Sequence, residues 1–177
     1  MKIDEAQWRQ IYNLLRFLGI TSTIALTLYY VPNYFIYEKL TAEHSGILMD
    51  LMGMKATVWV QDGKVFLNQF EIQRMCTGVQ VIAVFLGMIV AIPKVALKKK
   101  VVAFCTVAVS VYFANVGRIT FEVWLLYSGI LPWSLAHYPT GLILGVFSVA
   151  LLIVVADYFI PEIGDLALSA IDGFRRT

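Results

Sequence analysis

Residues 93–101 read PKVALKKKV and join two long apolar segments, residues 76–97 and 101–127. Each segment is long enough for an α-helix to cross the ~30 Å hydrocarbon core of a bilayer, which takes about 20 residues. Short links that are rich in lysine stay in the cytoplasm. The sequence therefore predicts two membrane helices that meet at the cytoplasmic face.

Two further apolar segments lie outward from this pair, at residues 17–37 and 139–160. Tyrosines crowd the far end of the first, as at a membrane interface, and Pro32 is expected to kink it. Arginines at both ends of the chain agree with cytoplasmic termini. The composition fits, because only 15% of the residues are charged, against about 25% in soluble domains. We predict one all-α membrane domain, residues 1–177, with four transmembrane helices in the cell membrane.

The segment between the first two spans is too polar to cross the bilayer. Residues 38–54 carry apolar side chains at helical spacing, which favours a short interfacial helix. Residues 56–72 hold two β-prone runs around Asp62 and Gly63, a typical hairpin signal. Strand edges need water or protein partners, and the topology puts this hairpin at the external face.

Three reactive side chains from three spans are predicted to reach the external face together. Cys76 begins the second span, and His137 directly precedes the fourth. Arg118 follows Lys100 by 18 residues, or about 27 Å along a helix. A thiol at a helix N-terminus is favoured as the nucleophilic thiolate. Histidine can take the thiol proton and later return it, and a guanidinium can stabilise an oxyanion. The three residue types together suit acyl transfer by a thiol.

Each of these residues also has a structural interpretation. A lone cysteine in a membrane helix often serves packing alone, and we assign no role to Cys105. A histidine at a helix start can be a cap. Glu122 follows Arg118 by four residues, so the two can form a simple ion pair within one helix. An intramembrane arginine is nevertheless costly and indicates function by default.

Local motifs resemble those of the exosortase/archaeosortase family. Residues 76–78 read CTG, similar to the family's Cys-(Ser/Thr)-Gly segment. Residues 115–118 read NVGR, which resembles its Asn-x-x-Arg motif, and residues 137–141 read HYPTG, similar to His-x-x-x-Gly. The resemblance covers about residues 50–150, with the motifs in the family's order, although many members carry more helices before the cysteine.

The resemblance implies a membrane cysteine protease or transpeptidase. Such enzymes cleave a C-terminal sorting signal that precedes a membrane helix in secreted proteins, through a thioester, and pass the protein to an acceptor, for which a lipid is one candidate. By carry-over, Cys76 is the nucleophile, His137 the acid and base, and Arg118 the charge stabiliser. Asn115 would orient Arg118, with Thr77 and Gly78 in support.

Two other functions remain open. A non-catalytic membrane subunit or transporter component would use Arg118 and Glu122 as structural or pathway charges. A disulfide-forming oxidoreductase needs paired cysteines, but Cys76 and Cys105 are predicted near opposite faces. The sequence indicates no metal site, no cofactor-binding motif and no nucleic-acid partner.

Overall fold

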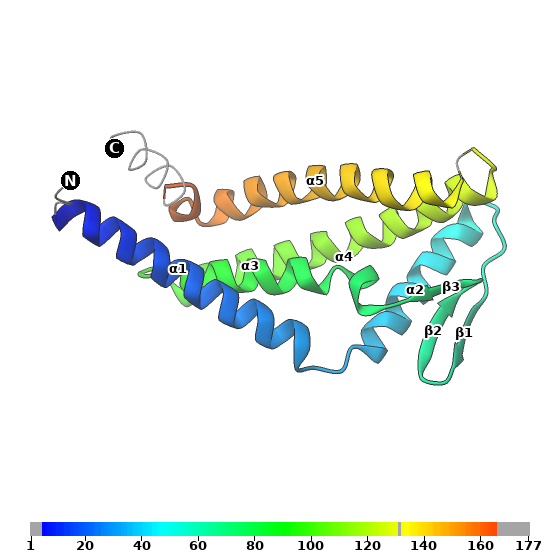
Figure 1. Cartoon of the computed structure of the whole chain (residues 1–177), viewed down its shortest axis with the longest axis horizontal. Helices are drawn as coiled ribbons and strands as arrows, with labels where there is room; N and C mark the ends of the chain where they lie inside the picture. Colours follow the sequence, from blue (N-terminus) through cyan, green and yellow to red (C-terminus); the bar gives the residue numbers. More distant parts are fainter. Residues whose placement is uncertain (1–4, 131, 166–177) are drawn as a thin grey trace. The chain divides into compact units, whose positions relative to one another are not determined.

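The computed structural model describes residues 5–130 and 132–165 of the chain (Figure 1). Helices predominate, which confirms the predicted all-α membrane class. Within these ranges three segments are long and apolar enough to cross a membrane. They are Trp8–Tyr30, Leu97–Tyr127 and Gly141–Phe159. The elements in chain order are α1 (Glu5–Tyr30), α2 (Phe35–Leu51), β1 (Val58–Gln61), β2 (Lys64–Leu67), β3 (Phe70–Ile72), η1 (Arg74–Thr77), α3 (Val79–Ala91), α4 (Leu97–Tyr127) and α5 (Trp133–Phe159).

The chain packs as two compact units. Among the described residues, unit 1 holds residues 5–31, 82–108 and 152–165. Unit 2 holds residues 32–81, 109–130 and 132–151. The three predicted site positions 76, 118 and 137 all belong to unit 2.

Pro32 separates two helices instead of kinking one. α1 ends at Tyr30 and α2 begins at Phe35, so the predicted span 17–37 divides between them. Proline lacks a backbone donor and disfavours helical geometry in the residue before it. Asn33 then accepts a 2.9 Å hydrogen bond from the Phe35 N–H at the start of α2. A helix is therefore present where an interfacial helix was predicted, but it starts three residues earlier than residue 38.

The predicted hairpin is present and extends to a third strand. β1, β2 and β3 form an antiparallel sheet in that order. Asp62 and Gly63 have φ angles of 50° and 74°, as a two-residue hairpin turn requires. The buried side chains of the sheet pack against α2 and α4 to form the core of unit 2. This core comprises Ala42, Met49, Val65, Leu67, Ile72, Ile119 and Val123.

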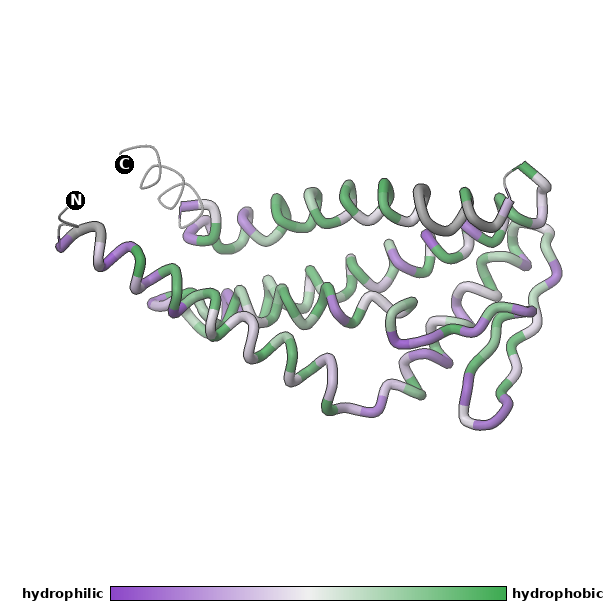
Figure 2. Tube along the Cα trace, in the orientation of Figure 1, coloured by the Kyte–Doolittle hydropathy of each residue, from purple (hydrophilic) through white to green (hydrophobic). Residues whose placement is uncertain are grey.

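α3 is shorter than the span predicted at residues 76–97. It covers Val79–Ala91, or 13 residues, about 20 Å at 1.5 Å per residue. Its apolar character is clear in Figure 2. The preceding residues form the separate turn η1, and Pro93 disfavours helical geometry beyond Ala91. Lys100 Nζ donates hydrogen bonds to the carbonyls of Val90 and Ile92, which stabilises the end of α3.

α5 begins at Trp133, whereas the sequence pattern predicted a start at Pro139. Pro132 lies directly before the first turn, where a proline's fixed φ is compatible with a helix start. Position 137 consequently lies within the first two turns of α5 rather than ahead of it.

α1 and α3 approach each other closely in unit 1. A Cβ atom added at Gly87 would lie 2.6 Å from the backbone oxygen of Thr21. Small residues allow such backbone contact between helices in membranes.

We expect Gly87→Ala to separate these two helices and lower the free energy of unfolding by about 2 kcal/mol. Thermal unfolding of the purified chain in detergent micelles measures the effect. Gly19→Ala is the matched control, because a Cβ at this α1 position meets nothing within 4 Å. An unchanged Tm in Gly87→Ala would contradict the close contact.

Candidate active site

Cys76 lies in a tight turn that connects the sheet to α3. β3 ends at Ile72, and η1 follows with the Cys76 N–H donating to the Gln73 carbonyl over 2.7 Å. The Thr77 hydroxyl is fully buried in the turn and donates to the Arg74 carbonyl over 2.7 Å. Thr77 therefore fixes the turn that carries the cysteine.

Gly78 allows this turn to lie directly against α4. Its φ of 73° is in the left-handed region, which glycine adopts more readily than residues with a side chain. A Cβ atom there would lie 3.1 Å from Val111 Cγ1 and 3.4 Å from Asn115 Cβ. The residues after the cysteine are thus required by backbone geometry and by close packing.

Asn115 links the cysteine turn to Arg118. Its Nδ2 donates a hydrogen bond to the backbone carbonyl of Cys76. Its Oδ1 accepts hydrogen bonds from Arg118 Nε at 3.3 Å and Nη2 at 3.1 Å. Asn115 is 9% exposed, so these bonds form largely away from water. The structure thus brings Cys76, Asn115 and Arg118 together.

Glu122 holds the other side of the guanidinium. Arg118 Nη1 donates to Glu122 Oε1 over 2.8 Å, and the two side chains are 22% and 8% exposed. The ion pair considered from the sequence is therefore real, and it coexists with the link to Cys76. An arginine has five N–H donors. Three of them are directed to Asn115 and Glu122, so two remain outside this network of described residues.

Gly141 brings α5 against the ion pair. A Cβ atom at this position would lie 3.0 Å from Glu122 Oε1 and 3.5 Å from Arg118 Nη1. Position 137 is four residues earlier in α5, and positions i and i+4 share one face of a helix. The side chain of His137 lies outside the described residues.

The environment of Cys76 differs from that expected at a helix N-terminus. Cys76 lies outside the three candidate spans, and Gly78 separates η1 from α3. Burial raises the pKa of the Cys76 thiol, and the charges of Glu122 and Glu38 act in the same direction. The Gln73 backbone and the Arg118 charge oppose this effect. The Cys76 thiol is accordingly protonated at neutral pH, so formation of the thiolate would need a base.

Glu38 is a neighbour of the cysteine that the sequence did not single out. It lies in the first turn of α2 and accepts a hydrogen bond from the backbone of Arg74 in η1. Burial raises the pKa of Glu38, and Arg74 partly offsets this rise. The Arg74 guanidinium lies 5.3 Å from the centre of the Tyr34 ring. Nothing in the sequence spacing links Glu38 to Cys76, because α2 joins the site only through tertiary packing.

The second histidine lies apart from this network. His44 Nδ1 is 2.6 Å from the hydroxyl of Tyr112, a contact between α2 and α4. Among residues 5–130 and 132–165, no group of three or more His, Cys, Asp or Glu is arranged to hold a metal ion.

We expect Glu38→Gln to shift the pH profile of Cys76 alkylation to lower pH. Glu38 raises the pKa of Cys76 when ionised, so removing its charge favours the thiolate, the form that reacts. Iodoacetamide labelling in a Cys105→Ser background gives the profile. Glu43→Gln, also on α2, is the matched control and should leave the midpoint in place. A profile unmoved in Glu38→Gln would contradict the contact between α2 and the cysteine turn.

Comparison with known proteins identifies the family. Residues 6–156 match the protein-family model described as transmembrane exosortase (Exosortase_EpsH). No curated protein and no solved structure matches the chain. The matched range covers most of the sequence and includes every residue of the network around Cys76. The chain therefore belongs to the transmembrane exosortase family.

Proposed function

We propose that the chain is a membrane cysteine transpeptidase that cleaves the C-terminal sorting signals of secreted proteins. Family membership makes it a sorting-related transmembrane protein. The observation that carries the finer proposal is the hydrogen-bonded path from the Cys76 carbonyl through Asn115 to Arg118. This path holds the partly exposed Arg118 guanidinium next to the turn that carries Cys76, which an ion pair with Glu122 alone would not require.

The proposed reaction has two steps. Cys76 Sγ loses its proton to His137 and attacks the carbonyl carbon of the scissile peptide bond. The C–N bond breaks, the amine leaves with a proton from His137, and the secreted protein remains as a thioester. An acceptor nucleophile, for which a membrane lipid is one candidate, then attacks the thioester. His137 takes the proton of the acceptor, the C–S bond breaks, and His137 returns the proton to the Cys76 thiolate.

Arg118 is proposed to stabilise the oxyanion of both tetrahedral intermediates. Asn115 and Glu122 hold its guanidinium from two sides, so the group is preorganised and does not need to reorient during the reaction. The two N–H donors outside the network can bind the developing negative charge. Removing one such donor costs about 10²–10³-fold in rate in well-studied enzymes.

Replacing the chromosomal gene with a Cys76→Ala variant tests this function in the source cells. Secreted proteins that end in a membrane helix and a basic tail should retain that tail, because no thioester can form. Mass spectrometry of their C-terminal peptides gives the result. Cys105→Ser is the matched thiol control and should process normally. Normal processing in Cys76→Ala would exclude the proposed function and favour a non-catalytic subunit.

The same processing assay should distinguish substitutions at two glycines of α5. Gly141→Ala places a methyl group against Glu122 and Arg118. We expect processing to fall about tenfold or more, because small displacements of catalytic groups are costly. Gly145→Ala, one turn later, meets nothing within 4 Å and should process as the parent does. Equal rates in the two variants would mean that α5 does not support Arg118.

The external position of the site can be tested by thiol labelling in intact cells. A membrane-impermeant maleimide should label Cys76 but not Cys105, and the signal should disappear in Cys76→Ala. It should slow in His137→Ala, because burial raises the pKa of the thiol and deprotonation then depends on a base. Labelling of Cys76 only after detergent treatment would contradict the proposed topology.

A further inference from the structure

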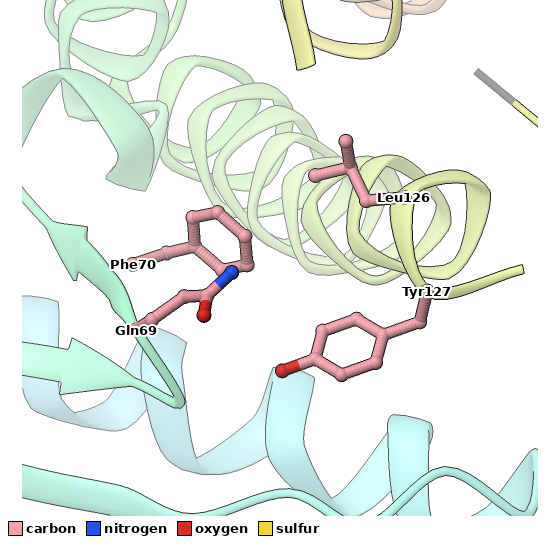
Figure 3. Close-up of a pocket in the computed structure, with 4 residues that line it drawn as sticks. All are labelled: Gln69, Phe70, Leu126 and Tyr127. Carbon is pink, nitrogen blue, oxygen red and sulfur yellow. The ribbon is translucent and has the colours of Figure 1, made fainter. Parts of the chain in front are cut away.

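Unit 2 contains a pocket of about 520 Å³ between the sheet and the end of α4. It is lined by Gln69 and Phe70, where β2 leads into β3, and by Leu126 and Tyr127 at the end of α4. Figure 3 shows the Tyr127 hydroxyl directed towards Gln69, with the Phe70 ring beside it. Nothing in the family motifs points to these four residues.

Both sides of the pocket belong to segments that also reach the candidate active site. On α4, two rows of side chains spaced four residues apart run into it. One row holds Asn115, Ile119, Val123 and Tyr127, and the other holds Arg118, Glu122 and Leu126. On the opposite wall, Phe70 and Cys76 both pack against the core cluster of unit 2. The pocket and the candidate site therefore lie on the same segments of unit 2.

We propose that this pocket binds an uncharged, bulky side chain of the substrate, three or four residues before the scissile bond. The inference rests on the proposed function. Leu126 follows Arg118 by eight residues, or about 12 Å along the helix axis. An extended peptide covers this distance in three to four residues at about 3.3–3.6 Å each.

The direction along the substrate follows from the position of the pocket on α4. The 31 residues of α4 extend for about 46 Å, which exceeds the ~30 Å hydrocarbon core. The pocket is formed by its last two residues and so lies beyond the hydrocarbon when the helix is centred. The membrane helix of the substrate follows the scissile bond, so the residue that reaches the pocket must precede it.

The lining determines the kind of side chain. Two aromatic rings and a leucine provide apolar contact, and none of the four residues carries a charge at neutral pH. The Gln69 amide and the Tyr127 hydroxyl can form hydrogen bonds with the peptide groups of the substrate. An aromatic or large aliphatic side chain fits this lining, whereas a charged one would lose hydration without gaining a partner.

Peptides with a C-terminal electrophile test the proposal on the purified full chain in nanodiscs. We would use acetyl-X-Ala-Ala-Ala-vinyl sulfone with Phe or Gly at X, together with the analogues that carry X one residue nearer the sulfone. The Cys76 thiol adds to the vinyl group, and mass spectrometry gives the rate at this residue. For at least one spacing, the Phe probe should label Cys76 about tenfold faster than its Gly partner, which corresponds to about 1.4 kcal/mol.

Tyr127→Ala should reduce this Phe-to-Gly ratio to about one. Tyr127 is 53% exposed, so the variant is expected to fold. Tyr30→Ala removes a tyrosine that is 67% exposed at the end of α1, and it should retain the tenfold ratio.

The outcomes separate the pocket from the proposed function. A ratio near one in the parent at both spacings, with Cys76 labelled, would overturn the pocket and leave the nucleophile in place. A tenfold ratio that persists in Tyr127→Ala would overturn the pocket as well. Maleimide labelling after denaturation shows whether the Cys76 thiol is intact. If it is intact and no probe labels it in the folded chain, both proposals are overturned.

Discussion

The contact between the cysteine turn and α4 is the constraint on which the candidate site depends. Asn115 can donate to the Cys76 carbonyl only because Gly78 has no side chain between the turn and the helix. The same amide presents its oxygen to Arg118. One side chain thus positions the backbone of Cys76 and the Arg118 guanidinium together. Loss of this contact would leave buried polar groups without partners, which costs more than the hydrogen bonds contribute.

The ion pair of Arg118 and Glu122 places two charged side chains where water is largely excluded. A charge pair that is largely shielded from water attracts strongly, but the loss of hydration offsets much of that gain. Stability alone is therefore a weak reason for the pair. Glu122 leaves the net charge of the site near zero, while Asn115 and Gly141 restrict where the guanidinium can lie. The pair is better explained by orientation, because a fixed guanidinium can act on a charge that forms only during a reaction.

Local rules explain what the sequence could predict. The hairpin followed from Asp62 and Gly63, whose φ angles any two-residue turn of this kind needs. The apolar runs predicted the helices, although prolines moved their ends at Tyr30 and Trp133. The motif residue Asn115 contacts Arg118, as the sequence predicted, while the roles of Cys76, Arg118 and His137 stay predictions. Glu38 was missed because it reaches the cysteine turn through the packing of α2 on the sheet, and no pattern along the chain encodes that contact.

The raised pKa of Cys76 changes how a thiol nucleophile in this site should be understood. A thiolate of higher pKa is intrinsically more nucleophilic, but less of it is present and it is a poorer leaving group. In the proposed reaction, attack would then require a base, and the thioester would be lost more slowly. The Arg118 charge favours the thiolate, so it would help the attack on the substrate. A thioester that persists would suit the proposed transfer, because the acceptor would have to reach the site before water hydrolyses the thioester.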